Sequence, residues 1–118
     1  MRITEVEFDT GTPVDGYGPG FFRVGGVVMT GAVLILPGST AAWGGYQATA
    51  QILEAADEID IVIVGTGPGI AHPPAAFRTA LEGAGVGVEP MASPAACRTY
   101  NVLLSEGRRV GAALLPVD

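Results

Sequence analysis

The stretch DIVIVGTGPG, residues 60–69, joins a continuous apolar run to a glycine-rich turn. Four β-branched residues in a row are typical of a strand that is covered on both faces, as the strands of parallel sheets are. The glycines at 65, 67 and 69 then end the strand. This stretch therefore predicts an α/β fold, and it raises the question of whether the glycine turn binds a nucleotide.

Helices and strands alternate on both sides of this stretch. A helical period spans residues 47–57, and early prolines with terminal glycines predict helices over 73–85 and 93–107. Short strands are expected at 86–91 and 109–117. The alternation predicts a parallel or mixed sheet with helical crossovers.

The last of these helices has a clear start signal. Ser93 is expected to be its N-cap and Pro94 to occupy its first turn. Gly107 follows the last helical residues and predicts where the helix stops.

The N-terminal third predicts β-structure. FFRV (21–24) and VVMTGAVLIL (27–36) flank Gly25-Gly26, a pair that can supply the positive φ angles of a tight hairpin turn. The exposed edge of this hairpin makes a homodimer compatible with the sequence. The remaining predictions for this part are an edge strand marked by Ile3, Val6 and Phe8 and loops at 10–20 and 38–46.

A length of 118 residues predicts a single domain over residues 1–118. Hydrophobic residues make up 48% of the chain and charged residues 15%, which argues against disorder. A net charge of −6 without a basic stripe argues against nucleic-acid binding. The longest apolar run is too short to span a bilayer and no signal core is evident, so we expect a cytoplasmic protein without membrane insertion.

Several chemistries lack the residues they need. All six cationic residues are arginine, so there is no Walker-type lysine and no lysine for a Schiff base. With one cysteine, Cys97, and one histidine, His72, neither a disulfide framework nor an ordinary Cys/His zinc site can form. We expect no metal and no cofactor.

The turn Gly65-Thr66-Gly67 holds two of the three glycines of a dinucleotide-binding fingerprint. Position 70 is isoleucine where the third glycine is needed, and the predicted helix begins late. The alternative is that Gly65 and Gly67 let the chain leave the sheet and pass close to a neighbouring element. We favour this structural interpretation.

Cys97 and His72 are the candidates for a catalytic pair. Both follow strands that are predicted to be parallel, at the end of the sheet where α/β proteins bind ligands. A cysteine near a helix N-terminus can be activated by a histidine. Cys97 also shares the apolar helix face of Ala96 and Tyr100, so a buried and inert thiol is the interpretation that we favour.

A small molecule or anion at this end of the sheet would meet a defined set of groups. Arg98 has the planar fork that binds carboxylates and phosphates, and it shares a helix face with Asn101. The favoured alternative is structural: a solvated helix face, or an Arg98 side chain that bonds a loop carbonyl. The ligand-binding candidates are Gly65, Thr66, Gly67, Ser93, Arg98 and Asn101, with His72 beside them.

Aromatic residues occur in the two glycine-rich loops. Tyr17, Trp43 and Tyr46 are spaced without the period of a core-forming element. Loop aromatics can anchor a protein partner, and they can equally cap the open end of a small core. Both interpretations are open at this point.

Four segments together resemble the Mth-domain family, which includes the mitochondrial respiratory complex I assembly factor 3 and the adipogenesis-associated Mth-domain protein. They are GYGPGFFRVGG (16–26), the loop Trp43, IVIVGTG (61–67) and, above all, GVGVEPMASPAACRTYNVLLSEGRRVGAALLP (85–116). The resemblance implies a three-layer α/β fold with a mixed central sheet flanked by helices and an accessory β-hairpin layer. It implies no established catalytic activity.

We therefore expect a non-enzymatic interaction protein, similar to an assembly factor, that binds protein partners. The alternative is a small-molecule or anion binder, or an enzyme, that uses the crevice near Gly65–Gly69, His72 and Cys97.

Overall fold

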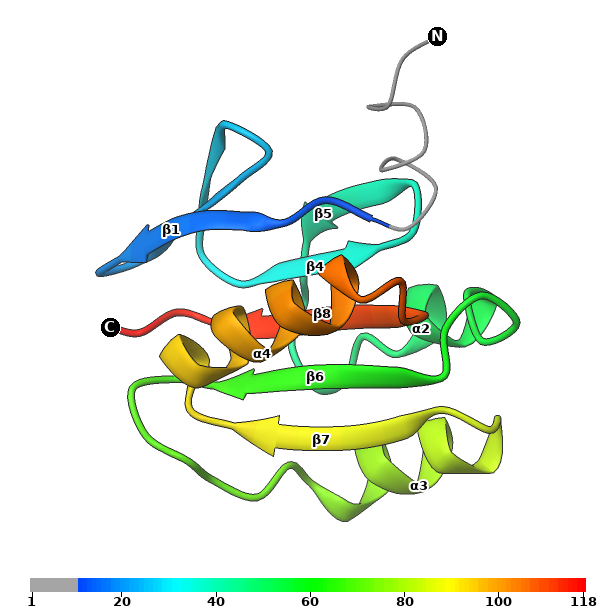
Figure 1. Cartoon of the computed structure of the whole chain (residues 1–118). Coiled ribbons are helices and arrows are strands. Elements are labelled where there is room, and N and C mark those ends of the chain that lie inside the picture. Colours follow the sequence, from blue (N-terminus) through cyan, green and yellow to red (C-terminus); the bar gives the residue numbers. More distant parts are fainter. Residues whose placement is uncertain (1–10) are drawn as a thin grey trace, which may run out of the picture.

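The computed structural model describes residues 11–118, and this part of the chain forms two β-sheets with three helices (Figure 1). The predicted edge strand at Ile3, Val6 and Phe8 lies outside the described residues. The strands are β1 (Val14–Gly18), β2 (Phe21–Val24), β3 (Val27–Thr30), β4 (Val33–Leu36), β5 (Ser39–Ala42), β6 (Ile61–Thr66), β7 (Gly87–Met91) and β8 (Val110–Leu115), and the helices are α2 (Ala50–Glu54), α3 (Ala75–Gly83) and α4 (Ser93–Ser105).

The main sheet is mixed, as predicted. Its strand order is β5-β4-β8-β6-β7. β6 pairs in parallel with both β7 and β8, whereas β4 runs antiparallel to β5 and β8. The carboxyl ends of β6, β7 and β8 therefore lie at the same end of the sheet, which is where α/β folds place ligands.

The second sheet is antiparallel, with the order β1-β2-β3. Gly25 and Gly26 form its two-residue turn with φ angles of +57° and +83°, which confirms the predicted hairpin. The accessory layer is larger than a hairpin because β1 adds a third strand. The prediction of a continuous loop over 10–20 is wrong at this point, because backbone pairing with β2 makes a strand of a glycine-rich segment.

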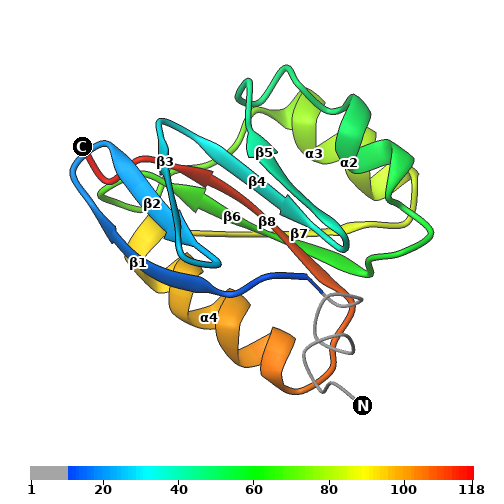
Figure 2. The same ribbon diagram turned by 90° about the horizontal axis from the view of Figure 1, so that it is seen from above.

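Three layers result from this arrangement. Figure 2 shows α2 and α3 on one side of the main sheet and α4 with β1–β3 on the other. Alternate residues of β6 point to opposite faces, so Val62 and Val64 pack toward α3, whereas Ile63 packs toward α4. Both faces of the main sheet are thereby buried in separate apolar clusters.

The predicted strand over 27–36 is divided between the two sheets. Gly31 has a φ of +83° and turns the chain after β3, so that β4 begins in the main sheet. The predicted loop over 38–46 is also partly wrong, because β5 lies within it. Its small residues form a strand through pairing with β4 and carry little strand preference of their own.

The predicted helices occur at the expected places. The helix predicted over 47–57 is shortened to the five residues of α2, whereas α3 and α4 differ from the prediction by two residues at most. Pro94 occupies the first turn of α4 as predicted. Ser93 is not the N-cap, because Ala92 has that position and the Ser93 side chain bonds elsewhere.

Candidate functional site

The carboxyl ends of β6 and β8 meet α4 at a single fully buried side chain, Ser93. Its Oγ accepts a hydrogen bond from the Gly67 N–H at 2.9 Å and donates to the Leu115 carbonyl at 2.5 Å. The Ser93 N–H donates to the Gly67 carbonyl at 2.8 Å. Two ligand-binding candidates, Gly67 and Ser93, are therefore bonded to each other, and a ligand there would have to displace these bonds.

Gly65 lies where α4 comes closest to β6. A Cβ atom at this position would be 2.7 Å from Ser93 Oγ and 3.1 Å from Ser93 Cα. Gly67, two residues later, has a φ of +102°, which a residue with a side chain rarely adopts. Gly65 thus shows the close approach to a neighbouring element, and Gly67 the change of backbone direction after the strand, that the structural interpretation of the glycine turn expects.

Thr66 holds the rest of the turn together. Its hydroxyl accepts from the Ala71 N–H at 3.1 Å and lies 2.7 Å from the Gly69 carbonyl and 3.2 Å from the Met91 carbonyl. The Thr66 hydroxyl, which could have bound an anion, is thus engaged with backbone groups of its own loop and of β7.

Cys97 and His72 have different environments. Cys97 is buried in the apolar cluster between α4 and the sheets, and its side chain is only 3% exposed. His72 is exposed in the loop after β6. Burial raises the pKa of Cys97 to about 11, and the charge of Arg98 acts in the opposite direction. Because the thiolate is the nucleophile, this environment works against the catalytic role considered for Cys97.

We expect Cys97 to react with iodoacetamide at pH 8 about a hundredfold more slowly in the folded protein than in urea, because a higher pKa leaves less thiolate. A thiol with a raised pKa stays protonated until the pH approaches that value, so the rate should climb with pH up to about 11. Mass spectrometry of time points measures the rate, with a cysteine peptide as the control. Equal rates in the two states would restore Cys97 as a candidate nucleophile.

Asn101, another ligand-binding candidate, uses both polar atoms of its side chain within the fold. Its Oδ1 accepts from the Val14 N–H at 2.9 Å and its Nδ2 donates to the Val14 carbonyl at 2.8 Å. The adjacent Tyr100 hydroxyl donates to the Thr12 carbonyl at 2.9 Å. Together they attach β1 to α4, whereas Arg98 is exposed on the same helix.

Replacing Asn101 by alanine should lower the free energy of unfolding by about 2 kcal/mol, because two partly buried backbone groups of Val14 lose their partners. Urea denaturation measures the loss, and amide hydrogen exchange should show faster exchange at Val14. Arg98→Ala is the control on the same helix and should change stability by less than about 0.5 kcal/mol. Similar losses in both variants would contradict the proposed attachment.

Two of the three loop aromatics cap the core. Trp43 is only 5% exposed, and its Nε1 donates to the Ala48 carbonyl at 3.2 Å. Its ring makes an edge contact with Tyr46 at 5.5 Å between centroids, and Tyr46 contacts Phe77 of α3 at 5.1 Å. Burial raises the pKa of Tyr46. Trp43 is therefore too buried to be an exposed anchor, and only Tyr17, 40% exposed, is on the surface.

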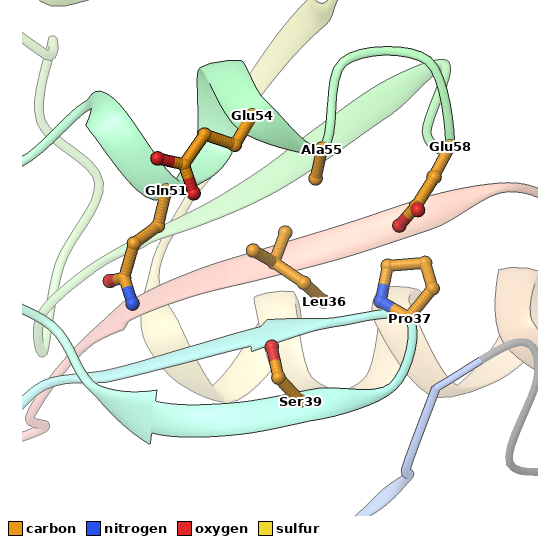
Figure 3. A pocket seen from close by; sticks show the side chains of 7 residues that line it. All are labelled: Leu36, Pro37, Ser39, Gln51, Glu54, Ala55 and Glu58. Carbon is orange, nitrogen blue, oxygen red and sulfur yellow. The ribbon is translucent and has the colours of Figure 1, made fainter.

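A pocket of about 210 Å³ lies between the β4–β5 turn and α2. Figure 3 shows Leu36 and Ala55 facing each other there, with Glu58 pointing toward Pro37. Glu54 also lines the pocket.

In the part of the chain from residue 11 onward, no group of three or more His, Cys, Asp or Glu side chains could hold a metal ion.

A larger groove of about 590 Å³ runs beside β3. All four β3 residues line it, and Thr40 of β5 contributes from the main sheet. No local pattern in the sequence indicates this groove, because the groove depends on how two separate sheets are placed. Within residues 11–118, no helix is long and apolar enough to cross a membrane.

Comparison with known proteins identifies the family of the chain. A family described as "Protein of unknown function (DUF498/DUF598)" matches residues 14–115. An uncharacterized protein of Rhodobacter capsulatus is 48% identical over 99% of this chain and 94% of its own length. Human NADH dehydrogenase (ubiquinone) 1 alpha subcomplex assembly factor 3 is 34% identical over 87% of this chain, and the match spans 60% of the human protein.

A solved structure confirms the fold. The solution structure of a Mth938-like domain from Bordetella pertussis has a TM-score of 0.73 and 29% identity, covering 90% of this chain and 86% of that one. The likeness supports the three-layer arrangement and the resemblance drawn from the sequence. The chain therefore belongs to the DUF498/DUF598 family and has the Mth938-like α/β fold.

Proposed function

We propose that this protein is a non-enzymatic interaction module that assists the assembly of a respiratory NADH dehydrogenase. The observation that carries the proposal is the 34% identity to the human assembly factor over 87% of this chain. The match spans 60% of the human protein, so the assembly role of the whole human protein is carried over here as a proposal and its partners are taken to be proteins.

The site geometry supports an interaction role over chemistry at the carboxyl end of the sheet. Two of the side chains that could bind a ligand there are engaged in the fold, Ser93 with Gly67 and Asn101 with Val14, whereas Arg98 and His72 are exposed. Burial keeps the Cys97 thiol protonated. A protein that acts through its surface needs these residues for stability and needs no reactive group.

Deletion of the gene in the source organism, followed by complementation, tests this proposal. We expect deletion to reduce the amount of assembled NADH dehydrogenase on native gels, and the wild-type chain to restore it. His72→Ala should restore it equally, because a role without catalysis needs no imidazole at this position. Normal assembly in the deletion strain would overturn the proposal, and a failure of folded His72→Ala would favour the ligand-binding alternative.

A further inference from the structure

We propose that the groove beside β3 binds an uncharged, extended segment of a partner protein, which adds a strand to the edge of β3 that no strand within residues 11–118 covers. This inference deepens the proposed function and rests on it for the class of partner. Strand addition uses backbone hydrogen bonds for affinity and alternate side chains for specificity, so it needs an open edge and a lined groove. Both are present at β3.

The edges of the two sheets differ in how well they are protected. Free edges are normally protected by charge, proline or a bulge. β1 has an irregular register between Val14 and Gly16 with the exposed Asp15 between them, and β7 carries Glu89 and Pro90. Among residues 11–118, β3 is the other edge of its sheet, and its sequence Val-Val-Met-Thr contains none of these devices. β5, the second edge of the main sheet, lacks them too and contributes Thr40 to the same groove.

The exposed apolar area at this edge is large for so short a strand. Val27 is 61% exposed and Val28 is 55% exposed, although valine is usually buried. The groove beside them holds about 590 Å³, within the range of sites that enclose a small ligand. An added strand would lie beside Val27 on one face of the sheet and Val28 on the other, and would pair with the backbone groups of β3 that no described strand bonds.

The lining determines the charge of the occupant. The groove is formed by threonine, valine, glycine and methionine, with no charged side chain among the described residues that line it. A charged side chain buried there would lose its hydration without gaining a partner, which is costly. The complementary segment is therefore uncharged and rich in β-branched residues.

A second copy of the chain is a weaker candidate. Stable dimers bury about 800 Å² per partner, and the four residues of β3 provide much less when two copies pair edge to edge. A partner segment can extend beyond β3 along the groove toward Thr40, so it does not depend on this short edge alone.

Titration of the isotope-labelled full chain with a short peptide of alternating threonine and valine tests the inference by NMR. We expect amide shifts to concentrate in residues 24–30 and at Thr40. Val28→Lys should weaken binding by at least about tenfold, because it places a charge on the unprotected edge strand, where lysine disfavours pairing with another strand. Val102→Lys is the matched control, since Val102 is 53% exposed on α4 and should leave binding unchanged.

A peptide with N-methylated amides along one edge should also fail to bind, and this arm does not depend on any variant folding. The inference is overturned if the peptide leaves the β3 amides unshifted, if Val28→Lys and Val102→Lys behave alike, or if the methylated peptide binds equally well. A wild-type dimer that Val28→Lys dissociates would identify a second copy as the occupant and would overturn it too.

The outcome is separable from that of the proposed function. Peptide binding at β3 with normal NADH dehydrogenase assembly in the deletion strain would retain the groove and reject the assembly role. If Val28→Lys complements the deletion fully and the wild-type chain binds no peptide, the assembly role is retained and peptide binding in the groove is rejected.

Discussion

Replacing Gly65 by alanine is expected to lower the free energy of unfolding by about 3 kcal/mol. The new Cβ would lie 2.7 Å from Ser93 Oγ, 3.0 Å from Leu114 Cδ2 and 3.1 Å from Ser93 Cα. Ser93 Cα is helix backbone, so the clash is relieved only if α4 moves away from β6. Urea denaturation followed by circular dichroism measures the loss.

Gly69→Ala is the matched control in the same turn. A Cβ atom at Gly69 meets nothing within 4 Å, and neither glycine has a positive φ. The substitution should therefore leave stability unchanged or raise it by up to about 1 kcal/mol, because alanine restricts the unfolded chain. If Gly65→Ala is no more damaging than Gly69→Ala, the close packing of α4 on β6 does not constrain this position.

Replacing Ser93 by alanine is the second substitution with a large expected effect, a loss of about 3 kcal/mol in the free energy of unfolding. The change leaves the Gly67 N–H and the Leu115 carbonyl without the hydroxyl that bonds both of them. A buried unpaired group costs about 1–3 kcal/mol. Thermal and urea unfolding of the purified variant measure the loss.

Ser105→Ala, at the other end of α4, is the control for this change. The Ser105 hydroxyl is exposed and donates to Val102 within its own helix, so its removal should alter stability by less than about 0.5 kcal/mol. Comparable losses at the two serines would show that Ser93 does not join the strand ends as inferred.

The second half of the fold was predictable because its signals are local. Prolines and glycines mark the ends of α3 and α4, and a continuous run of β-branched residues marks β6. Each of these preferences acts within a few residues, so no knowledge of distant contacts is needed. The resemblance to the Mth-domain family, confirmed by the comparisons, depends mainly on this half.

The first half was harder to predict because partners decide its structure. β1 and β5 consist largely of small, glycine or polar residues, and they become strands by pairing with β2 and β4. At Gly31, a single positive φ separates β3 from β4, yet the apolar sequence continues across it. Local preference could not show which sheet each strand joins.

The candidate site shows the same limit. From the sequence, Ser93 and Gly67 are expected at the carboxyl end of the sheet, and in the structure they bond directly to each other. It could not show that Asn101 reaches the backbone of Val14, 87 residues earlier in the chain. Nor could it show the groove beside β3, because the groove requires the relative position of two sheets.

The position of β8 has a consequence for synthesis of the protein. β8 lies in the middle of the main sheet, between β4 and β6, yet it is translated after every other described strand. Until it leaves the ribosome, the β4–β5 pair and the β6–β7 pair lack the strand that joins them. The sheet therefore completes late, through contacts between distant parts of the chain, and the nascent protein exposes unpaired strand edges that chaperones can bind.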